Sequence, residues 1–395
     1  MKKIFSSLKY ANFRLFWFGQ LVSLTGTWVQ MVAQGWLVLE LTNSAFLLAM
    51  INVISAAPIM LFSLVGGVVA DRVNKKKILI VTQSLSVVLA FCLGALVSLK
   101  LAAFWNIAVI AGLLGLVNAF DVPTRQAFVV ETIDKSSLNN AIALNSLLFN
   151  SARIIGPVIA GFLAGWLGIA SCFYINSISF LAVIVALVFM TGDFSPKDLS
   201  KRPMVEGVIE GARYILSHRN MRALVAVTAV SSIFGMANVV LMPIFARDIL
   251  GVGIKGLGFL MSSVGIGAIF GGLILARFGH EGNRKIFVKS GTIILALSLI
   301  LFAMSTSYVF SLCLLLAAGW GIITQAVSVN TLLQMETPDN LRGRAMSFYT
   351  LVFLGMTPFG SFIAGLLAHW FGAPIALLFS GSACLLLTPL FFKDI

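Results

Sequence analysis

The dominant feature of this sequence is a series of long apolar runs, each able to cross a lipid bilayer as one helix. A span of about 20 mostly apolar residues matches the bilayer core. Lipid offers no hydrogen-bond partners, so the backbone of each run has to satisfy its own polar groups, as a helix does. We therefore predict an all-α membrane protein with twelve transmembrane helices, at about 14–40, 46–70, 78–99, 104–131, 139–166, 170–190, 221–247, 256–279, 286–306, 309–335, 345–371 and 374–392.

The charged residues are few and unevenly distributed. Only 10% of the 395 residues are charged, against about 25% in soluble domains. The net charge of +13 could suggest a nucleic-acid partner, but with the N-terminus inside, Lys and Arg gather on one side of the membrane. The exceptions are Lys100, Arg247 and Lys255 outside and Arg153 within a span. This positive-inside bias predicts a multi-pass protein of a bacterial-type inner membrane, with both termini cytoplasmic and no nucleic-acid partner.

The longest polar interval, residues 192–220, divides the chain into two halves. Within it, Val205, Ile209, Ala212 and Leu216 form the apolar side of an amphipathic helix, which we expect to lie along the cytoplasmic membrane surface. The predicted domains are an N-terminal six-helix bundle (1–191), a linker (192–220) and a C-terminal six-helix bundle (221–395).

The second half repeats the first. Residues 12–14 recur at 220–222, Gly66-Gly67 recurs as Gly271-Gly272, and the stretch from Gly156 to Gly168 recurs from Gly360 to Gly372. Such internal repeats are typical of secondary transporters. The copies differ in charge, because Asp71 and Arg153 fall opposite Ala276 and Thr357. Ionic chemistry is therefore expected mainly in the first half.

A burst of charge separates the second and third runs, in the pattern G-x-x-x-D-R-x-x-x-K-K formed by Gly67, Asp71, Arg72, Lys76 and Lys77. It resembles the G-x-x-x-D-R-x-G-x-R-K loop of the major facilitator superfamily. Asn74 stands where glycine is usual, and we expect it to adopt the left-handed backbone that asparagine tolerates. The alternative is a basic loop that only fixes topology.

The resemblance implies a gating role for this loop. In the family arrangement, Asp71 docks at the N-terminus of the eleventh helix, near Arg342 and Arg344, when the cytoplasmic side is closed. The helix dipole and the arginines would favour an anion there.

The fifth run contains a second motif. Gly156, Pro157 and Gly161 match the G-x-x-x-G-P-x-x-G-G antiporter motif of the superfamily, with alanine at 152 and 160. In the family this motif accompanies export; close helix packing is the alternative use of the same glycines. The sequence segments at 12–17, 120–128 and 150–157 resemble those of the enterobactin-exporter and macrolide-efflux branch of the superfamily. That resemblance implies two six-helix bundles, alternating access around a central cavity and proton-driven export.

Asp121 lies near the middle of the fourth run, where a charge costs about 2.5–3.5 kcal/mol. An ionised carboxylate at this depth has to be protonated or paired. Arg153 lies near the midplane of the next run, and we expect it to be the partner, with Arg125 as a second one. We predict that these three residues couple proton movement to transport. The alternative is a static structural ion pair.

Polar residues at helical spacing predict the substrate cavity. The first run carries four of them at intervals of 4, 3 and 4, and such a stripe cannot face lipid. Interhelical hydrogen bonding is the alternative for any one member. The predicted cavity residues are Ser23, Thr27, Gln30, Gln34, Asn118, Asn150, Asn238 and Gln325.

These features predict a monomeric secondary transporter that exports a small amphipathic compound, such as a drug, macrolide or siderophore-like molecule. We expect contacts with membrane lipids, the proton gradient as energy source, and neither cofactor nor metal. An importer and a lysophospholipid flippase of the same fold are alternatives. An intramembrane enzyme has little support, because the three histidines form no H-E-x-x-H motif (His218, His280 and His369).

Overall fold

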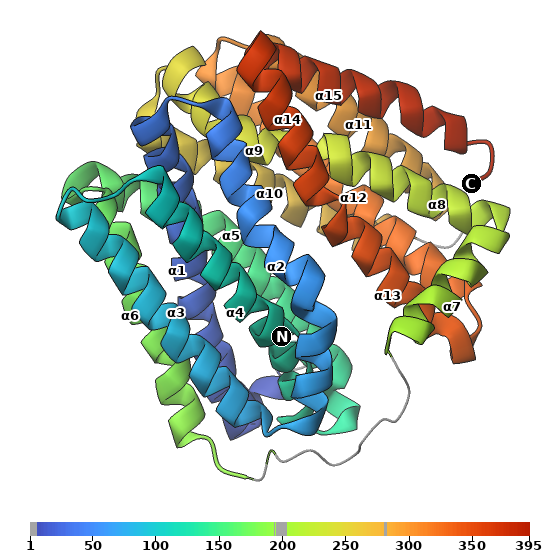
Figure 1. The fold of residues 1–395 in the computed structure, drawn as a ribbon. Coiled ribbons are helices and arrows are strands. Elements are labelled where there is room, and N and C mark those ends of the chain that lie inside the picture. The colour runs from blue at the N-terminus through green and yellow to red at the C-terminus, as the bar shows by residue number, and fades with distance from the viewer. Residues whose placement is uncertain (1–5, 193, 195–203, 280–282) are drawn as a thin grey trace. The chain divides into compact units, whose positions relative to one another are not determined.

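The computed structural model describes residues 6–192, 194, 204–279 and 283–395 (Figure 1). This described part of the chain is helical, with turns between the helices and no strand. The predicted all-α membrane fold is confirmed. His280 lies outside the described residues.

The first half contains six long helices and two short 3-10 turns. The elements are η1 (Ser6–Lys9), α1 (Ala11–Thr42), α2 (Ala45–Arg72), α3 (Lys75–Ser98), α4 (Phe104–Glu131), η2 (Lys135–Ser137), α5 (Leu138–Leu167) and α6 (Ile169–Phe189). The predicted run at 104–131 coincides with α4, and the other ends differ by a few residues.

The second half has more breaks than the apolar runs suggest. Its elements are α7 (Met204–Ser217), α8 (Arg219–Val230), η3 (Ser231–Gly235), α9 (Ala237–Ile244), η4 (Phe245–Ile249), α10 (Gly253–Phe278), α11 (Arg284–Met304), α12 (Tyr308–Glu336), α13 (Asp339–Gly355), α14 (Thr357–Phe371), α15 (Ala373–Leu387) and η6 (Thr388–Phe391). Both η3 and η4 are π-helical turns, which are frequent at functional sites. Pro358 at the start of α14 lacks a backbone N–H, and the eleventh span breaks there.

Eleven helical spans among the described residues are long and apolar enough to cross a membrane. They correspond to the second through twelfth predicted runs. At 32 residues, α1 is also long enough, but its polar stripe makes it less apolar than the others.

The chain forms two compact units. Unit 1 comprises Met1–Leu41 and Ile54–Lys201, and unit 2 comprises Thr42–Val53 and Arg202–Ile395. The division within the linker falls inside the predicted 192–220 interval, whereas the first residues of α2 pack with unit 2. There the Phe46 ring lies 6.0 Å from the Phe362 ring, measured between centroids.

The repeat seen in the sequence has a structural counterpart in each unit. In unit 1, Gly66 of α2 lies against the Ala119 carbonyl of α4, where a Cβ atom would collide. In unit 2, a Cβ atom at Gly271 of α10 would lie 2.5 Å from Ile323 Cγ2 of α12. The repeated glycine thus serves the same close helix approach in both units.

Helix α7 packs on α13 within unit 2. A Cβ atom at Gly211 would collide with the Arg344 backbone, and Ile215 is fully buried. By contrast, the predicted apolar residues Ile209 and Leu216 are 54% and 50% exposed. Val205 lies outside the residues whose side chains are described. The linker helix therefore has one face on its own unit and a second, apolar face left uncovered.

Candidate functional site: a buried charge network in unit 1

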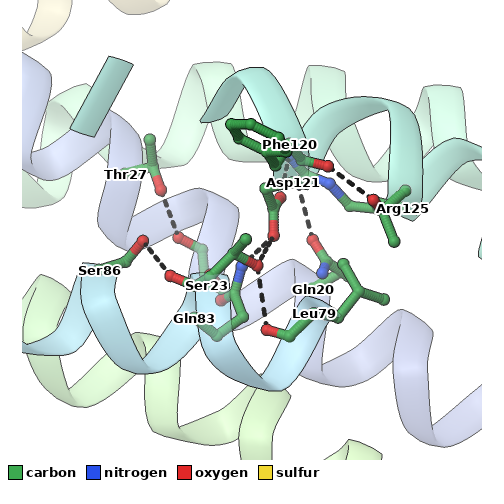
Figure 2. A network of polar contacts seen from close by, with 11 residues as sticks. Gln20, Ser23, Thr27, Leu79, Gln83, Ser86, Phe120, Asp121 and Arg125 are labelled. Carbon is green, nitrogen blue, oxygen red and sulfur yellow. Dashed lines mark hydrogen bonds and ion pairs between the residues drawn. The ribbon is translucent and has the colours of Figure 1, made fainter. Parts of the chain in front are cut away.

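Asp121 lies at the centre of a buried polar network in unit 1 (Figure 2). Its side chain is almost inaccessible, with the residue 2% exposed. The Oδ1 atom accepts hydrogen bonds from Thr82 Oγ1 and Gln83 Nε2, both at 2.8 Å. The Oδ2 atom lies 3.0 Å from Arg125 Nη2. Two neutral donors and one guanidinium thus surround the carboxylate.

The network joins three helices. Arg125 follows Asp121 by one turn on α4, a spacing at which side chains on a helix meet. Its Nη1 atom donates to Gln20 Oε1 on α1 at 2.9 Å, while Thr82 and Gln83 come from α3. Figure 2 shows Gln20, Gln83 and Arg125 converging on Asp121 from these helices. The network therefore lies wholly within unit 1.

The network leaves one buried donor and one buried acceptor unpaired. These atoms are Gln20 Nε2 and Gln83 Oε1. A buried water commonly satisfies groups of this kind. The surroundings of Asp121 therefore have hydrogen-bonding capacity that the protein itself does not use.

Arg153, the predicted partner of Asp121, does not contact it. Arg125 takes that place, because it lies one turn away on the same helix and needs no particular rotation of α5. Two guanidinium nitrogens of Arg153, Nε and Nη2, are buried without a hydrogen-bond partner among the described residues. A cation in this condition is unusual inside a membrane-spanning bundle.

Two predicted cavity residues bond to neighbouring helices of their own unit. Gln30 is 5% exposed, and its Oε1 atom accepts from Asn176 Nδ2 on α6 at 2.7 Å. Gln325 is 4% exposed and donates to Ser231 Oγ at 2.9 Å. The structure therefore places both at helix-to-helix contacts.

The other predicted cavity residues vary in exposure. On α1, Ser23 is 3% exposed, and its carbonyl accepts from Thr27 Oγ1 at 3.0 Å. Asn150 donates to the Ser146 carbonyl at 2.9 Å. Thr27 is exposed, and Gln34, Asn118 and Asn150 are partly exposed.

Unit 2 has polar groups without partners beside its π-helical turn. Asn238 is completely buried, and both its amide oxygen and its amide nitrogen are unpaired. The hydroxyls of Ser232 and Ser328 are also buried and unpaired. A small cavity next to η3 is lined by Ser232, Gln325 and other residues of the same unit. This cavity has room for about one water molecule at most.

Three network residues were not singled out from the sequence: Gln20, Thr82 and Gln83. Gln20 continues the stripe of α1, since it lies three residues before Ser23. That spacing was a usable signal for Gln20. The α3 residues had none, because their importance depends on which helix faces Asp121.

The basic loop joins neighbouring helix ends of unit 1. Lys75 Nζ lies 2.8 Å from Glu131 Oε1 at the end of α4, and Lys76 Nζ donates to the Met190 carbonyl at 2.9 Å. The expectation of a left-handed Asn74 is wrong. Its φ is −58°, because its side chain caps α3 and accepts from Lys77 N at 3.2 Å.

The remaining loop motif residues lie around the end of α2. Gly67 is buried, whereas Asp71 and Arg72 are exposed. In unit 2, Arg342 Nη2 lies 2.6 Å from Asp339 Oδ1, and Arg344 forms an ion pair with Glu210 of α7. The docking of Asp71 near these arginines stays a prediction.

The antiporter-like motif lies where α5 crosses α1. A Cβ atom at Gly156 would collide with Trp28 Cβ and lie 3.0 Å from the Thr25 carbonyl. Pro157 is accommodated inside a continuous α5, and both Pro157 and Gly161 are buried. Gly156 therefore permits close packing, whatever further role the motif has.

The chain matches known transporters along nearly its whole length. A family model described as "Transmembrane secretion effector" matches residues 3–394. The Staphyloferrin A transporter of Staphylococcus aureus is 25% identical over 374 residues, covering 93% of this chain and 92% of that protein. The Multidrug efflux pump Tap of Mycolicibacterium fortuitum is 24% identical, covering 89% and 88%. The Enterobactin exporter of Shigella boydii is 21% identical, covering 86% and 80%.

Solved structures show the same fold. A bacterial homologue of the iron transporter ferroportin, in its inward-facing state, has a TM-score of 0.75 and 15% identity. The superposition covers 97% of this chain and 98% of that one. A bacterial homologue of the human lysosomal transporter Spinster also has a TM-score of 0.75, with 14% identity and coverage of 98% and 96%.

Proposed function

Because the chain belongs to the Transmembrane secretion effector family of the major facilitator superfamily, we propose that it is a secondary active transporter exporting a small amphipathic compound. The compound is a drug, macrolide or siderophore-like molecule, exchanged for protons by alternating access. The protein lies in a bacterial inner membrane with both termini cytoplasmic. Relatives named for siderophore and multidrug transport support the export proposal.

The observation that carries the proton-coupled part of the proposal is the buried carboxylate of Asp121. In this conformation it is held by three side chains, those of Thr82, Gln83 and Arg125. Protonation removes its attraction to Arg125, which in turn is bonded to Gln20 on α1. Proton uptake at Asp121 therefore changes the α4-to-α1 contact. A water molecule bonded to Gln20 Nε2 and Gln83 Oε1 would satisfy both of these unpaired atoms.

This arrangement changes the expected coupling mechanism. Every partner of Asp121 belongs to unit 1, so motion of the two units as rigid bodies leaves these contacts intact. Coupling then requires a local movement of α1, α3 or α4. We propose Arg125, rather than Arg153, as the residue that exchanges its bond when Asp121 takes up a proton.

Transport into inside-out membrane vesicles tests the proposal. A panel containing a labelled macrolide, a catecholate siderophore, a cationic dye and a fluorescent lysophospholipid is offered with an imposed inward-acid gradient. We expect accumulation of at least one of the first three compounds, and its loss when a protonophore collapses the gradient. Uptake by right-side-out vesicles instead would indicate an importer. Transport of the lipid alone would indicate a flippase.

The Asp121→Asn variant tests the assigned proton carrier. It should abolish accumulation driven by the gradient while keeping exchange of substrate at equilibrium. Asp134→Asn is the control, because Asp134 lies outside the spans, where Tyr10 donates to it at 2.6 Å. Full proton-driven export by a folded Asp121→Asn protein would exclude Asp121 as the proton carrier and make Glu131 or Glu40 the next candidate.

A further inference from the structure

Arg153 is a partly exposed residue whose guanidinium has no counter-charge among the described residues. Its Nε and Nη2 atoms are buried and have no hydrogen-bond partner, and Arg153 takes part in none of the ion pairs found among the described residues. The carboxylate at comparable depth, Asp121, is already held by Arg125. A buried charge without a partner destabilises the protein, and an anion bound from outside would supply the missing counter-charge.

Arg153 belongs to a polar stripe on α5. Ser146, Asn150 and Arg153 follow at i, i+4 and i+7 on one side of the helix, with Ser146 exposed and the other two partly exposed. Ile155, 47% exposed, lies about 200° further around the helix at 3.6 residues per turn. The apolar side chain of Ile155 can face lipid, whereas the polar side chains of the stripe are unfavourable there. The stripe therefore faces protein or water rather than lipid.

An aromatic surface adjoins the guanidinium. Phe149 lies one turn before Arg153 on the same side of α5 and is 47% exposed. Its ring stands 6.0 Å from the Trp28 ring of α1, at an interplanar angle of 70°. Gly156, one turn beyond Arg153, lets α5 approach Trp28. A cation and an exposed aromatic ring thus lie side by side on one helix.

We propose that Arg153 binds the carboxylate of the transported compound, whose apolar body packs against Phe149 and Trp28. The inference rests on the proposed export function and narrows the substrate class to amphipathic carboxylates. Nε and the adjacent Nη2 are neighbouring donors on one edge of the planar guanidinium, and a carboxylate accepts from such a pair with both oxygens. These two nitrogens are the ones without a partner in the protein.

A matched pair of probes tests this site. Dansylglycine and dansylglycinamide share their aromatic body and differ in carrying a carboxylate or an uncharged amide. Fluorescence titration of the full-length protein in nanodiscs gives the ratio of their dissociation constants. We expect the wild-type protein to prefer the carboxylate by about 10- to 100-fold, the range of a charge-assisted bond. Equal binding of the two probes, or no binding of dansylglycine, would overturn the inference.

Three variants distinguish the contributions to probe binding of the charge of Arg153, the shape of its guanidinium and the aromatic surface. Arg153→Gln should bring the ratio close to one. Arg153→Lys should keep part of the preference for the carboxylate probe, because lysine retains the positive charge but lacks the paired donors of the planar guanidinium. Phe149→Ala should weaken the binding of both probes equally and leave the ratio of their dissociation constants unchanged. A carboxylate preference that persists in Arg153→Gln would place the anion elsewhere.

Transport measured in parallel keeps the two proposals distinguishable. Vesicles that accumulate an uncharged macrolide while the protein binds both dansyl probes equally would refute the carboxylate site and leave export intact. Conversely, a clear carboxylate preference that Arg153→Gln removes, without transport of any compound in either direction, would support the site and contradict the transporter proposal.

Discussion

Arg125 and Asp121 form an ion pair across one turn of α4, with Nη2 and Oδ2 3.0 Å apart. The same guanidinium reaches Gln20 on α1 at 2.9 Å. The pair thus belongs to one helix, and its extension ties that helix to a second helix of the same unit. A change at the carboxylate therefore acts directly on the α3-to-α4 contact and, through Arg125, on the α1-to-α4 contact.

A double-mutant cycle measures this pair. Asp121→Asn and Arg125→Gln should each lower stability by about 1.5–3 kcal/mol while leaving the protein folded, because each removes a hydrogen bond to a charged group. The double variant should be less destabilised than the sum of the two by about 0.5–3 kcal/mol. Thermal unfolding of the purified variants gives these values. Strict additivity would mean that the two charges are not coupled.

Gln30 and Gln34 are chemically identical side chains four residues apart on α1, and the structure gives them different surroundings. Gln30→Ala leaves Asn176 Nδ2 without its acceptor, so we expect a loss of about 1–3 kcal/mol and equally reduced transport of every substrate. Gln34 is partly exposed, and Gln34→Ala should change the substrate profile at unchanged stability. Transport of the compound panel, compared with melting temperatures, distinguishes the two effects. The assignment fails if the two variants behave alike.

Two adjacent glycines of α10 provide a matched test of helix packing. Gly271→Ala places a Cβ atom 2.5 Å from Ile323 Cγ2, so we expect a loss of about 1–3 kcal/mol from overpacking. Gly272 has open space around its Cβ position, and Gly272→Ala should be neutral or stabilising by up to about 1 kcal/mol. Melting temperatures of the two variants report the difference. Equal destabilisation would show that α10 and α12 are not in the contact described.

The gating prediction for Asp71 concerns its charge. If Asp71 docks near Arg342 and Arg344 when the cytoplasmic side is closed, Asp71→Asn should shift the population toward the inward-open state by up to about tenfold. Asp71→Glu keeps the anion and serves as the control. The readout is thiol labelling of cysteines engineered on the cytoplasmic side of the cavity, with Cys92 and Cys313 first replaced because both are exposed. Unchanged labelling in Asp71→Asn would remove the gating role.

The membrane-spanning helices could be predicted from the sequence because hydropathy is a local property. The run at 104–131 matches α4. The glycines that recur in the sequence, Gly66 and Gly271, lie at close helix contacts in both units. The breaks at η3 and η4 were not predicted. A π-helical turn adds one residue to a helical turn and leaves the apolar character of the span unchanged.

The partners of the polar residues were decided by the tertiary structure. The sequence placed Asp121 and Arg153 at similar depth, because depth depends only on counting residues along two helices. Whether two side chains meet also depends on how each helix is rotated about its axis and which helix lies between them. Packing brought Thr82 and Gln83 to Asp121, Gln20 to Arg125 and Gln30 to Asn176. Arg125 could reach the carboxylate within its own helix, and two nitrogens of Arg153 were left without a partner among the described residues.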